Sequence, residues 1–168
     1  MSEEPTPGEE PEPGEEPEPG GAARPPESVR RMFAEDAASQ ALGIELLEAE
    51  AGSALLKMTV TRQMVNGHGI AHGGYLFLFA DTAFACACNG RGPVTVAAGA
   101  GIDFLAPVRE GDVLLAQAEE RHRAGRGGLY DVRLLRGSEV VAEFRGRSRE
   151  LRRGGAADAV SGDGRRSE

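Results

Sequence analysis

Apolar and polar positions follow three different periods along this chain, and each period predicts a kind of element. The first ordered segment carries apolar residues at helical spacing: Val29, Met32, Phe33 and Ala37. Ser28 is a candidate cap for this helix and Gly43 a candidate stop. The pattern therefore predicts one helix at the start of the domain.

Strict alternation of apolar and polar residues follows. Residues 44–50 and 53–61 alternate on either side of Ala51-Gly52, which predicts a hairpin with Leu56, Met58 and Val60 on one face. Extended runs recur at 94–104, 112–123, 129–136 and 139–150, separated by turn signals rich in glycine. We expect these last four runs to form strands of a meander.

Residues 73–89 differ from both patterns because they are apolar nearly all round and contain good helix formers without proline. Such a helix is expected to be buried on every side. Strands without crossover helices pair antiparallel. The pattern thus predicts an α+β fold in which a curved antiparallel sheet wraps one long apolar helix.

Charge is spread unevenly over the 168 residues. Eight glutamates and no base lie in residues 1–21, so the formal charge of −8 belongs to that segment. We expect residues 1–26 to be a disordered acidic tail, either solubilising or docking, 27–151 to be one domain, and 152–168 to be a flexible C-terminal tail. The neutral domain argues against nucleic-acid binding.

Cys86 and Cys88 are the only cysteines, and on a helix they point about 200° apart. Neither a disulfide nor a cysteine-based zinc site is predicted. No apolar run is long enough to span a membrane, and the acidic N-terminus is unlike a signal peptide. We expect a cytoplasmic protein with no membrane partner, no metal and no cofactor.

The run HGGYLFLFAD places Asp81 inside the most apolar segment of the chain. No basic residue lies within a helical turn of it, so burial is expected to raise the pKa of Asp81 and make it a candidate base or nucleophile. The alternative is a structural carboxylate that caps neighbouring backbone. Gly73 and Gly74 open the helix, where unpaired amides can form an oxyanion hole.

The spacing of these groups has a geometric consequence. Asp81 follows Gly73 by eight residues, which is roughly 12 Å along one helix. A single carbonyl group cannot contact both, so the two groups must come from two antiparallel helices. We therefore predict a homodimer with two shared sites.

Three other sites are disfavoured. His68 and His72 have the spacing of zinc ligands, but the glycines around them oppose a helix and the glutamate of HExxH is absent. A serine triad lacks its G-x-S-x-G turn. Cys88 shows no feature that would lower the pKa of its thiol.

Residues 28–150 resemble the hotdog-fold acyl-CoA thioesterases of the phenylacetate-degradation type. The resemblance rests on NGHGIAHGGYLFLFADTAFACACNGRG, followed by GIDFLAPVREGD, YDVRLL and FRGRS. It implies a hotdog fold, dimers that pair into one larger sheet and often dimers of dimers. The implied reaction is hydrolysis of a small aryl- or acyl-CoA, with hydroxyphenylacetyl-CoA the favoured substrate.

Site residues follow from the same resemblance. Asp81 is the catalytic carboxylate, as nucleophile or as base for water, and the Gly73 amide polarises the thioester carbonyl. His72 orients the loop or the carbonyl, and Asn66 helps to hold substrate or water. The candidate contacts to the substrate are Gly74, Thr82, Gly99, Arg145 and Arg147.

One departure from the family concerns residues 97–101, which read AAGAG where some relatives carry a serine, threonine or aspartate. Small residues there let an acyl chain or pantetheine lie close to the backbone. Arg145 and Arg147 are candidate contacts for the phosphates of coenzyme A. The alternative is that they belong to an ordinary solvated face of the strand. A hotdog dehydratase and a non-catalytic acyl-CoA sensor are the other functions considered.

Overall fold

The structure is a computed structural model that describes residues 24–152. Most of the two predicted tails, residues 1–23 and 153–168, lies outside the described residues. Within residues 24–152, no helix is both long and apolar enough to cross a membrane.

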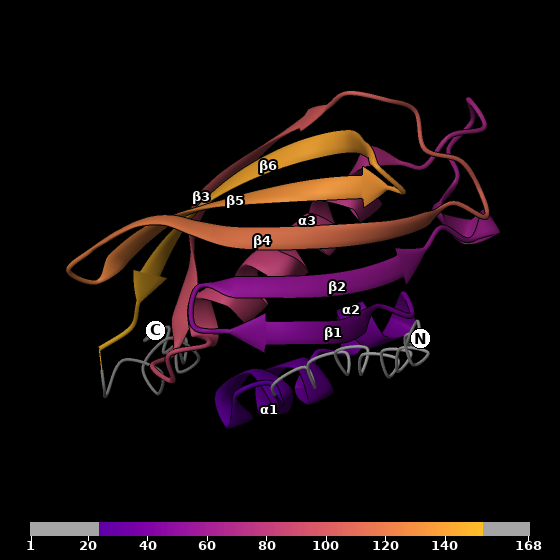
Figure 1. Ribbon diagram of the computed structural model, residues 1–168. Coiled ribbons are helices and arrows are strands. Elements are labelled where there is room, and N and C mark those ends of the chain that lie inside the picture. Colours follow the sequence, from indigo (N-terminus) through magenta and orange to yellow (C-terminus); the bar gives the residue numbers. More distant parts are fainter. Residues whose placement is uncertain (1–23, 153–168) are drawn as a thin grey trace, which may run out of the picture.

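Six antiparallel strands form one curved sheet in the order β1-β2-β4-β5-β6-β3 (Figure 1). The strands are β1 (Glu45–Glu50), β2 (Ser53–Thr59), β3 (Thr95–Phe104), β4 (Val113–Ala124), β5 (Gly127–Arg136) and β6 (Glu139–Glu150). The long helix α3 (Gly73–Asn89) lies in the hollow of this sheet. The predicted α+β architecture and the bounds of the long helix are confirmed.

The strand order corrects one expectation. Strands β4, β5 and β6 do form a meander, but β3 pairs with β6 and not with β4. The physical reason is that β4 has only two edges, and β2 and β5 occupy both. The chain between β3 and β4 therefore crosses over, and β3 becomes an edge strand.

Edge strand β3 is unusually apolar for its exposure. It pairs with β6 along one side only, yet Val96 is 42% exposed, Phe104 53% and the adjoining Leu105 58%. An unpaired edge with apolar side chains favours pairing with another strand. Within residues 24–152, the outer edge of β3 therefore stays unpaired.

Helix α3 has two different sides. Phe79, Ala83 and Phe84 are at most 1% exposed against the sheet, and Phe84 packs its ring on Tyr130 and Phe144. A second stripe keeps accessible surface at a spacing of four, three and four residues: Gly74, Leu78, Asp81 and Ala85. The expectation of burial on every side is therefore wrong for this stripe within one chain.

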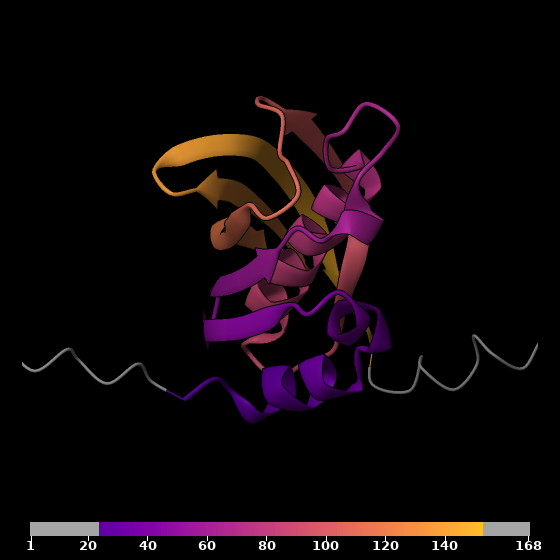
Figure 2. The same cartoon turned by 90° about the vertical axis from the view of Figure 1, so that its right-hand side faces the viewer.

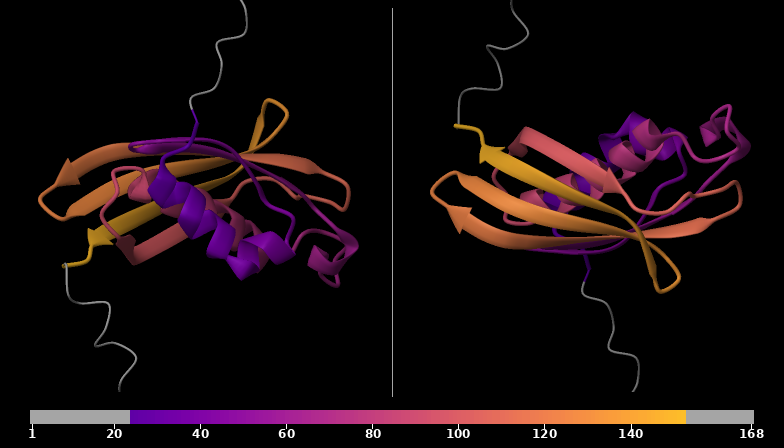
Figure 3. Two further views of the ribbon diagram at one scale, coloured as in Figure 1. Left: turned by 90° about the horizontal axis from the view of Figure 1, so that it is seen from below. Right: turned by 90° about the horizontal axis from the view of Figure 1, so that it is seen from above.

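The predicted first helix is in fact two, α1 (Glu27–Glu35) and α2 (Ala37–Ala41), which lie below the sheet beside α3 (Figures 2 and 3). The chain breaks at Asp36, whose side chain accepts a hydrogen bond from the Ser39 amide and so begins a new helix. Gly43 does follow the helical segment, at φ 65°. The predicted cap, Ser28, instead donates its hydroxyl to the Asn89 carbonyl.

Candidate active site

The start of α3 holds an amide, that of Gly73, without an acceptor in the described residues. His72 is the N-cap residue, and its Nδ1 accepts a hydrogen bond from the Gly74 N–H at 3.1 Å, so the neutral ring carries its proton on Nε2. The Gly73 N–H finds no acceptor among residues 24–152. Because the start of a helix also carries partial positive charge, Gly73 and not Gly74 offers the amide to a ligand.

A loop places Asn66 next to this amide. The Asn66 side-chain oxygen accepts a hydrogen bond from the His68 N–H at 2.9 Å, and the backbone of the same residue pairs with Ile70. The Asn66 side-chain amide donates to no group within the described part of the chain. Asn66 and Gly73 line one pocket of about 360 Å³ together with apolar residues that include Phe104. The structure thus brings together three predicted residues, Asn66, His72 and Gly73.

Phe104 covers the glycine itself. A Cβ atom on Gly73 would lie 2.7 Å from Cζ of Phe104, well inside van der Waals contact. The absence of a side chain at position 73 therefore lets an aromatic ring of β3 approach the start of α3. Sequence reasoning missed Phe104, because the strand that carries it joins the site only through the fold.

Asp81 lies in the middle of α3 on the half-exposed stripe. Burial is the main cause that raises the pKa of its carboxyl, and the negative charge of Asp36 adds to it. No hydrogen bond or ion pair in residues 24–152 engages this carboxylate, whereas the shared-helix neighbour Asn89 makes several. The alternative in which Asp81 caps nearby backbone is therefore not what the structure has.

Thr82, predicted as a substrate contact, faces the other way. Its hydroxyl lies 2.9 Å from the Ser39 hydroxyl and 2.9 Å from the Leu78 carbonyl, and the residue is 7% exposed. Both contacts are internal to the chain. Because the Thr82 hydroxyl is buried and already has partners inside the chain, a role in binding substrate is disfavoured.

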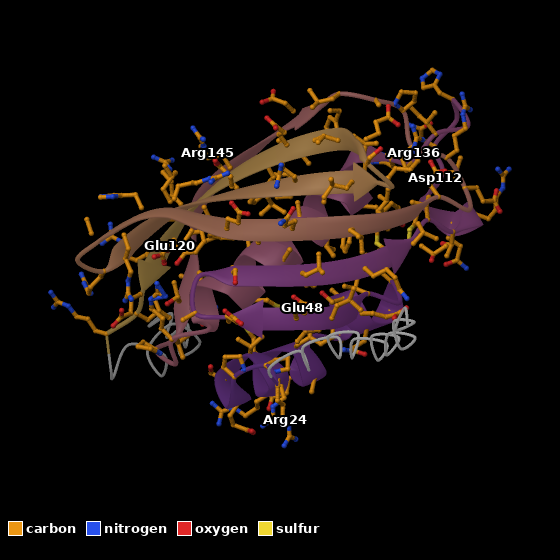
Figure 4. The ribbon with its side chains drawn as sticks, viewed as in Figure 1. Arg24, Glu48, Asp112, Glu120, Arg136 and Arg145 are labelled. Atoms are coloured by element: carbon orange, nitrogen blue, oxygen red, sulfur yellow. The ribbon has the colours of Figure 1, made fainter. Side chains whose placement is uncertain are left out.

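The two predicted arginines have different surroundings. Arg145 donates two hydrogen bonds to Asp131, at 2.7 and 3.0 Å, and Figure 4 shows it on the side of β6 away from α3. Together with Arg121 it holds the pKa of Asp131 below its usual range. Arg145 is thus largely neutralised within the chain.

Arg147 has no carboxylate within 4 Å in the described residues. It pairs across strands with Gly99, and a Cβ atom on that glycine would lie 2.7 Å from its Nη2. The guanidinium therefore rests on β3, where small residues make room for it. It borders a pocket of about 670 Å³ whose polar lining is His122, Arg126, Arg147, Ser148 and Arg149.

This pocket joins three arginines for which residues 24–152 provide no acidic partner: Arg126, Arg147 and Arg149. Sequence reasoning did not find Arg126, because it lies in the turn between β4 and β5 and reaches the other two only through strand pairing. Three cations around one hollow make this pocket a candidate site for a polyanion.

The two cysteines and a metal cluster are the other candidates for a reactive site in residues 24–152. Burial raises the pKa of the Cys86 and Cys88 thiols to about 12, so neither forms a thiolate near neutral pH. No group of three metal-binding side chains is found within residues 24–152.

Comparisons with known proteins agree with this architecture. The family model described as Thioesterase superfamily matches residues 68–143. Acyl-coenzyme A thioesterase PaaI of Escherichia coli (strain K12) is 44% identical over 126 residues, 74% of this chain and 90% of the relative. The solved structure of the E. coli PaaI protein superposes with a TM-score of 0.73 and covers 74% of this chain and 91% of its own.

Two further structures share the fold. A variant of the phenylacetic acid degradation protein PaaI from Thermus thermophilus is 35% identical, with a TM-score of 0.67, covering 69% of this chain and all of its own. The smu.793 protein of Streptococcus mutans UA159, solved with bound acetyl CoA, is 23% identical with a TM-score of 0.62, covering 64% of this chain and 88% of its own. The chain therefore belongs to the thioesterase superfamily, as a hotdog-fold thioesterase similar to the acyl-CoA thioesterases of phenylacetic acid degradation.

Proposed function

We propose that this thioesterase hydrolyses small aryl- and acyl-CoA thioesters, with hydroxyphenylacetyl-CoA the favoured type, to the free acid and coenzyme A. Asp81 is the catalytic carboxylate, and the Gly73 amide is the oxyanion hole. The relatives named for phenylacetic acid degradation support the substrate class. The site chemistry rests on the residues themselves.

The reaction needs a nucleophile on one side of the carbonyl carbon and a donor on its oxygen. Asp81 either attacks the carbon itself, giving an anhydride that water then hydrolyses, or takes a proton from the attacking water. In both routes the C–S bond breaks and the thiolate of coenzyme A leaves with a proton from solvent. The Gly73 N–H stabilises the negative charge that develops on the carbonyl oxygen.

Two copies of the chain complete each site. Gly73 and Asp81 are roughly 12 Å apart along α3, so the amide that faces Asp81 comes from a second chain lying antiparallel. The midpoint between these residues is Phe77, which places the two-fold axis beside it. The half-exposed stripe of α3 and the apolar edge of β3 both support this homodimer.

The phosphates of coenzyme A bind the pocket of Arg126, Arg147 and Arg149. These guanidiniums have no carboxylate partner in residues 24–152, whereas Arg145 is held by Asp131. Arg147 therefore remains the better of the two predicted arginines. His72 and Asn66 keep their predicted roles at the thioester, since both lie beside Gly73.

A single observation carries the proposal: Asp81 is a half-buried carboxylate to which no group in residues 24–152 donates a hydrogen bond. A group of this kind costs stability at neutral pH, and a role in a reaction is a reason for a protein to keep it. A non-catalytic acyl-CoA sensor, the alternative function, would keep the pocket without needing Asp81.

The test is thiol release from a panel of aryl and short acyl-CoAs by the wild type and by Asp81→Asn. Asparagine preserves size and removes the charge, so kcat is expected to fall roughly a hundredfold to ten-thousandfold. A wild type that binds acyl-CoA but releases no thiol would favour the sensor instead.

The arginine pocket is tested with Arg147→Ala and its matched control, Arg145→Ala. The first is expected to raise KM for acyl-CoA about tenfold, in keeping with the loss of one charge-assisted hydrogen bond. The second should change KM by less than about twofold, because Arg145 already binds Asp131. Equal effects of the two substitutions would place the phosphates elsewhere.

A further inference from the structure

The arginine pocket is lined by apolar residues as well as by cations. It lies where β4 turns into β5, at one end of the sheet (Figure 1). Leu129 and three small residues, Ala98, Ala124 and Gly127, share the lining with the guanidiniums. A phosphate alone needs only cations, whereas an apolar surface suits the flat ring of a base. The volume of about 670 Å³ falls in the range of roughly 300–1,000 Å³ that is typical of small-molecule sites.

The charge of the pocket calls for an anion with more than one negative group. Within residues 24–152, Arg126, Arg147 and Arg149 form no ion pair. Glu150, the acidic residue next to Arg149 in the sequence, is bound by Arg123 at 3.0 Å. Like charges gathered in one place repel each other, so several phosphate charges are favoured there. Coenzyme A carries a diphosphate and, on its ribose, a separate 3′-phosphate.

Strand pairing sets the three arginines in a row. On the β5 side of β6, Arg147 pairs with Leu129. Arg149 pairs with Gly127, and Arg126 directly precedes that glycine in the turn. Arg126 and Arg149 therefore lie together at the end of the sheet, and Arg147 lies nearer its middle.

Strand β3 and helix α3 run side by side in opposite directions. Phe104, at the end of β3, covers Gly73 at the start of α3. Thr95, at the start of β3, exchanges two hydrogen bonds with the Asn89 side chain at the end of α3. The middle of β3 therefore lies level with the middle of α3.

This alignment gives the row of arginines a direction. Asp81 lies at the middle of α3 and Gly99 at the middle of β3. Arg147 rests on Gly99, so it is the arginine of the row nearest to the level of Asp81. Arg149 pairs with Val96, farther toward the start of β3. The row thus begins level with the proposed catalytic carboxylate and leads away from it.

In coenzyme A the diphosphate follows the pantetheine arm, and the adenosine with its 3′-phosphate is the far end. We propose that the arginine pocket binds this 3′-phosphoadenosine end, with Arg147 on the diphosphate and with Arg126 and Arg149 on the 3′-phosphate. The inference rests on the proposed function and names the feature by which the site selects coenzyme A. A thioester on the phosphopantetheine arm of a carrier protein has neither the adenosine nor the 3′-phosphate.

The 3′-phosphate is isolated by comparing coenzyme A with dephospho-coenzyme A, which lacks only that group. Calorimetry gives the Kd of each ligand for the full-length protein and needs no turnover. The wild type is expected to bind coenzyme A at least about tenfold more tightly, which corresponds to one charge-assisted hydrogen bond.

Substitutions separate the two ends of the row. Arg149→Ala and Arg126→Ala are each expected to weaken coenzyme A but not dephospho-coenzyme A, so the preference falls to about threefold or less. Unchanged binding of dephospho-coenzyme A also shows that these variants are folded. Arg147→Ala is expected to weaken both ligands by the same factor. Arg145→Ala is the matched control and should change neither, because Asp131 already holds that guanidinium.

Equal affinities of the wild type for the two ligands, or binding of neither, overturn the inference. An Arg149→Ala protein that weakens both ligands alike overturns it as well. Thiol release tests the proposed function separately. A wild type that prefers coenzyme A to dephospho-coenzyme A but hydrolyses no thioester would retain the nucleotide site and refute the proposed reaction.

Discussion

The two sides of α3 are built from one continuous stretch of sequence but obey different rules. The side toward the sheet, with Phe79, Ala83 and Phe84, is buried and apolar. The opposite stripe keeps Asp81 half-exposed, and no residue of 24–152 forms a hydrogen bond or ion pair with it. Packing therefore explains the first side, whereas the proposed function accounts for the second through a substrate and a second copy of the chain. Three predictions test this difference.

Phe84→Ala should have the largest effect, and only on stability. The ring is 1% exposed and lies against Tyr130, Phe144 and the close approach of Gly146. We expect a loss of about 3–5 kcal/mol in the free energy of unfolding, measured by denaturant titration. Phe84→Leu, which leaves a smaller cavity, should cost less. A folded Phe84→Ala protein with near wild-type stability would show that this side of α3 is not the packed one.

Gly73→Ala should reduce activity rather than stability. The new Cβ would meet the far end of the Phe104 ring, which can turn aside into solvent because it is half-exposed. It would also stand beside the amide proposed to bind the carbonyl oxygen, so kcat/KM is expected to fall about a hundredfold.

The control for this substitution is the adjacent Gly74→Ala. Its Cβ would lie 3.4 Å from Nδ1 of His72, which is an ordinary contact, and alanine suits a helix better than glycine. We expect kcat/KM to change less than about threefold, with the Tm unchanged or raised. Equal losses in both variants would mean that the first turn of α3 acts as a whole and not through the Gly73 amide.

Asp81→Asn should have the smallest effect on folding, and in the stabilising direction. In the unfolded chain the Asp81 carboxyl has its ordinary pKa of 3.8. Its raised pKa in the folded protein means that the folded state holds the proton more tightly. Stability from this group is therefore complete below pH 3.8 and is lost as the pH rises through the folded-state pKa. Asp81→Asn has no carboxyl to ionise at this position, so it does not lose this stability as the pH rises.

The expected outcome is a higher Tm for Asp81→Asn than for the wild type near neutral pH, with the difference shrinking toward acid pH. Thermal unfolding at a series of pH values measures it. A lower Tm for the variant at neutral pH would mean that the ionised carboxylate finds a stabilising partner other than the residues 24–152 of its own chain.

Local patterns in the sequence carry much of this fold. The period of two located the strands, and the uniformly apolar run at 73–89 located α3 with its bounds, because a helix or strand repeats its buried positions at short range. The same run held Gly73 and Asp81 at a known separation along the helix. Asn66 and His72 lie beside Gly73 through the short loop before α3, again within a few residues.

Tertiary structure alone decided what depends on distant contacts. The edge position of β3 followed from competition for the two edges of β4, and Thr82 turned inward because Ser39, 43 positions earlier, offered its hydroxyl a partner. Arg145 and Arg147 look alike in the sequence, but only Arg145 meets Asp131 on the neighbouring strand. Short-range periodicity thus determined the elements and the spacing of the candidate site. The partner of each polar side chain was set by strand pairing and helix packing, since hydrogen bonds and ion pairs form between groups that only folding brings within reach.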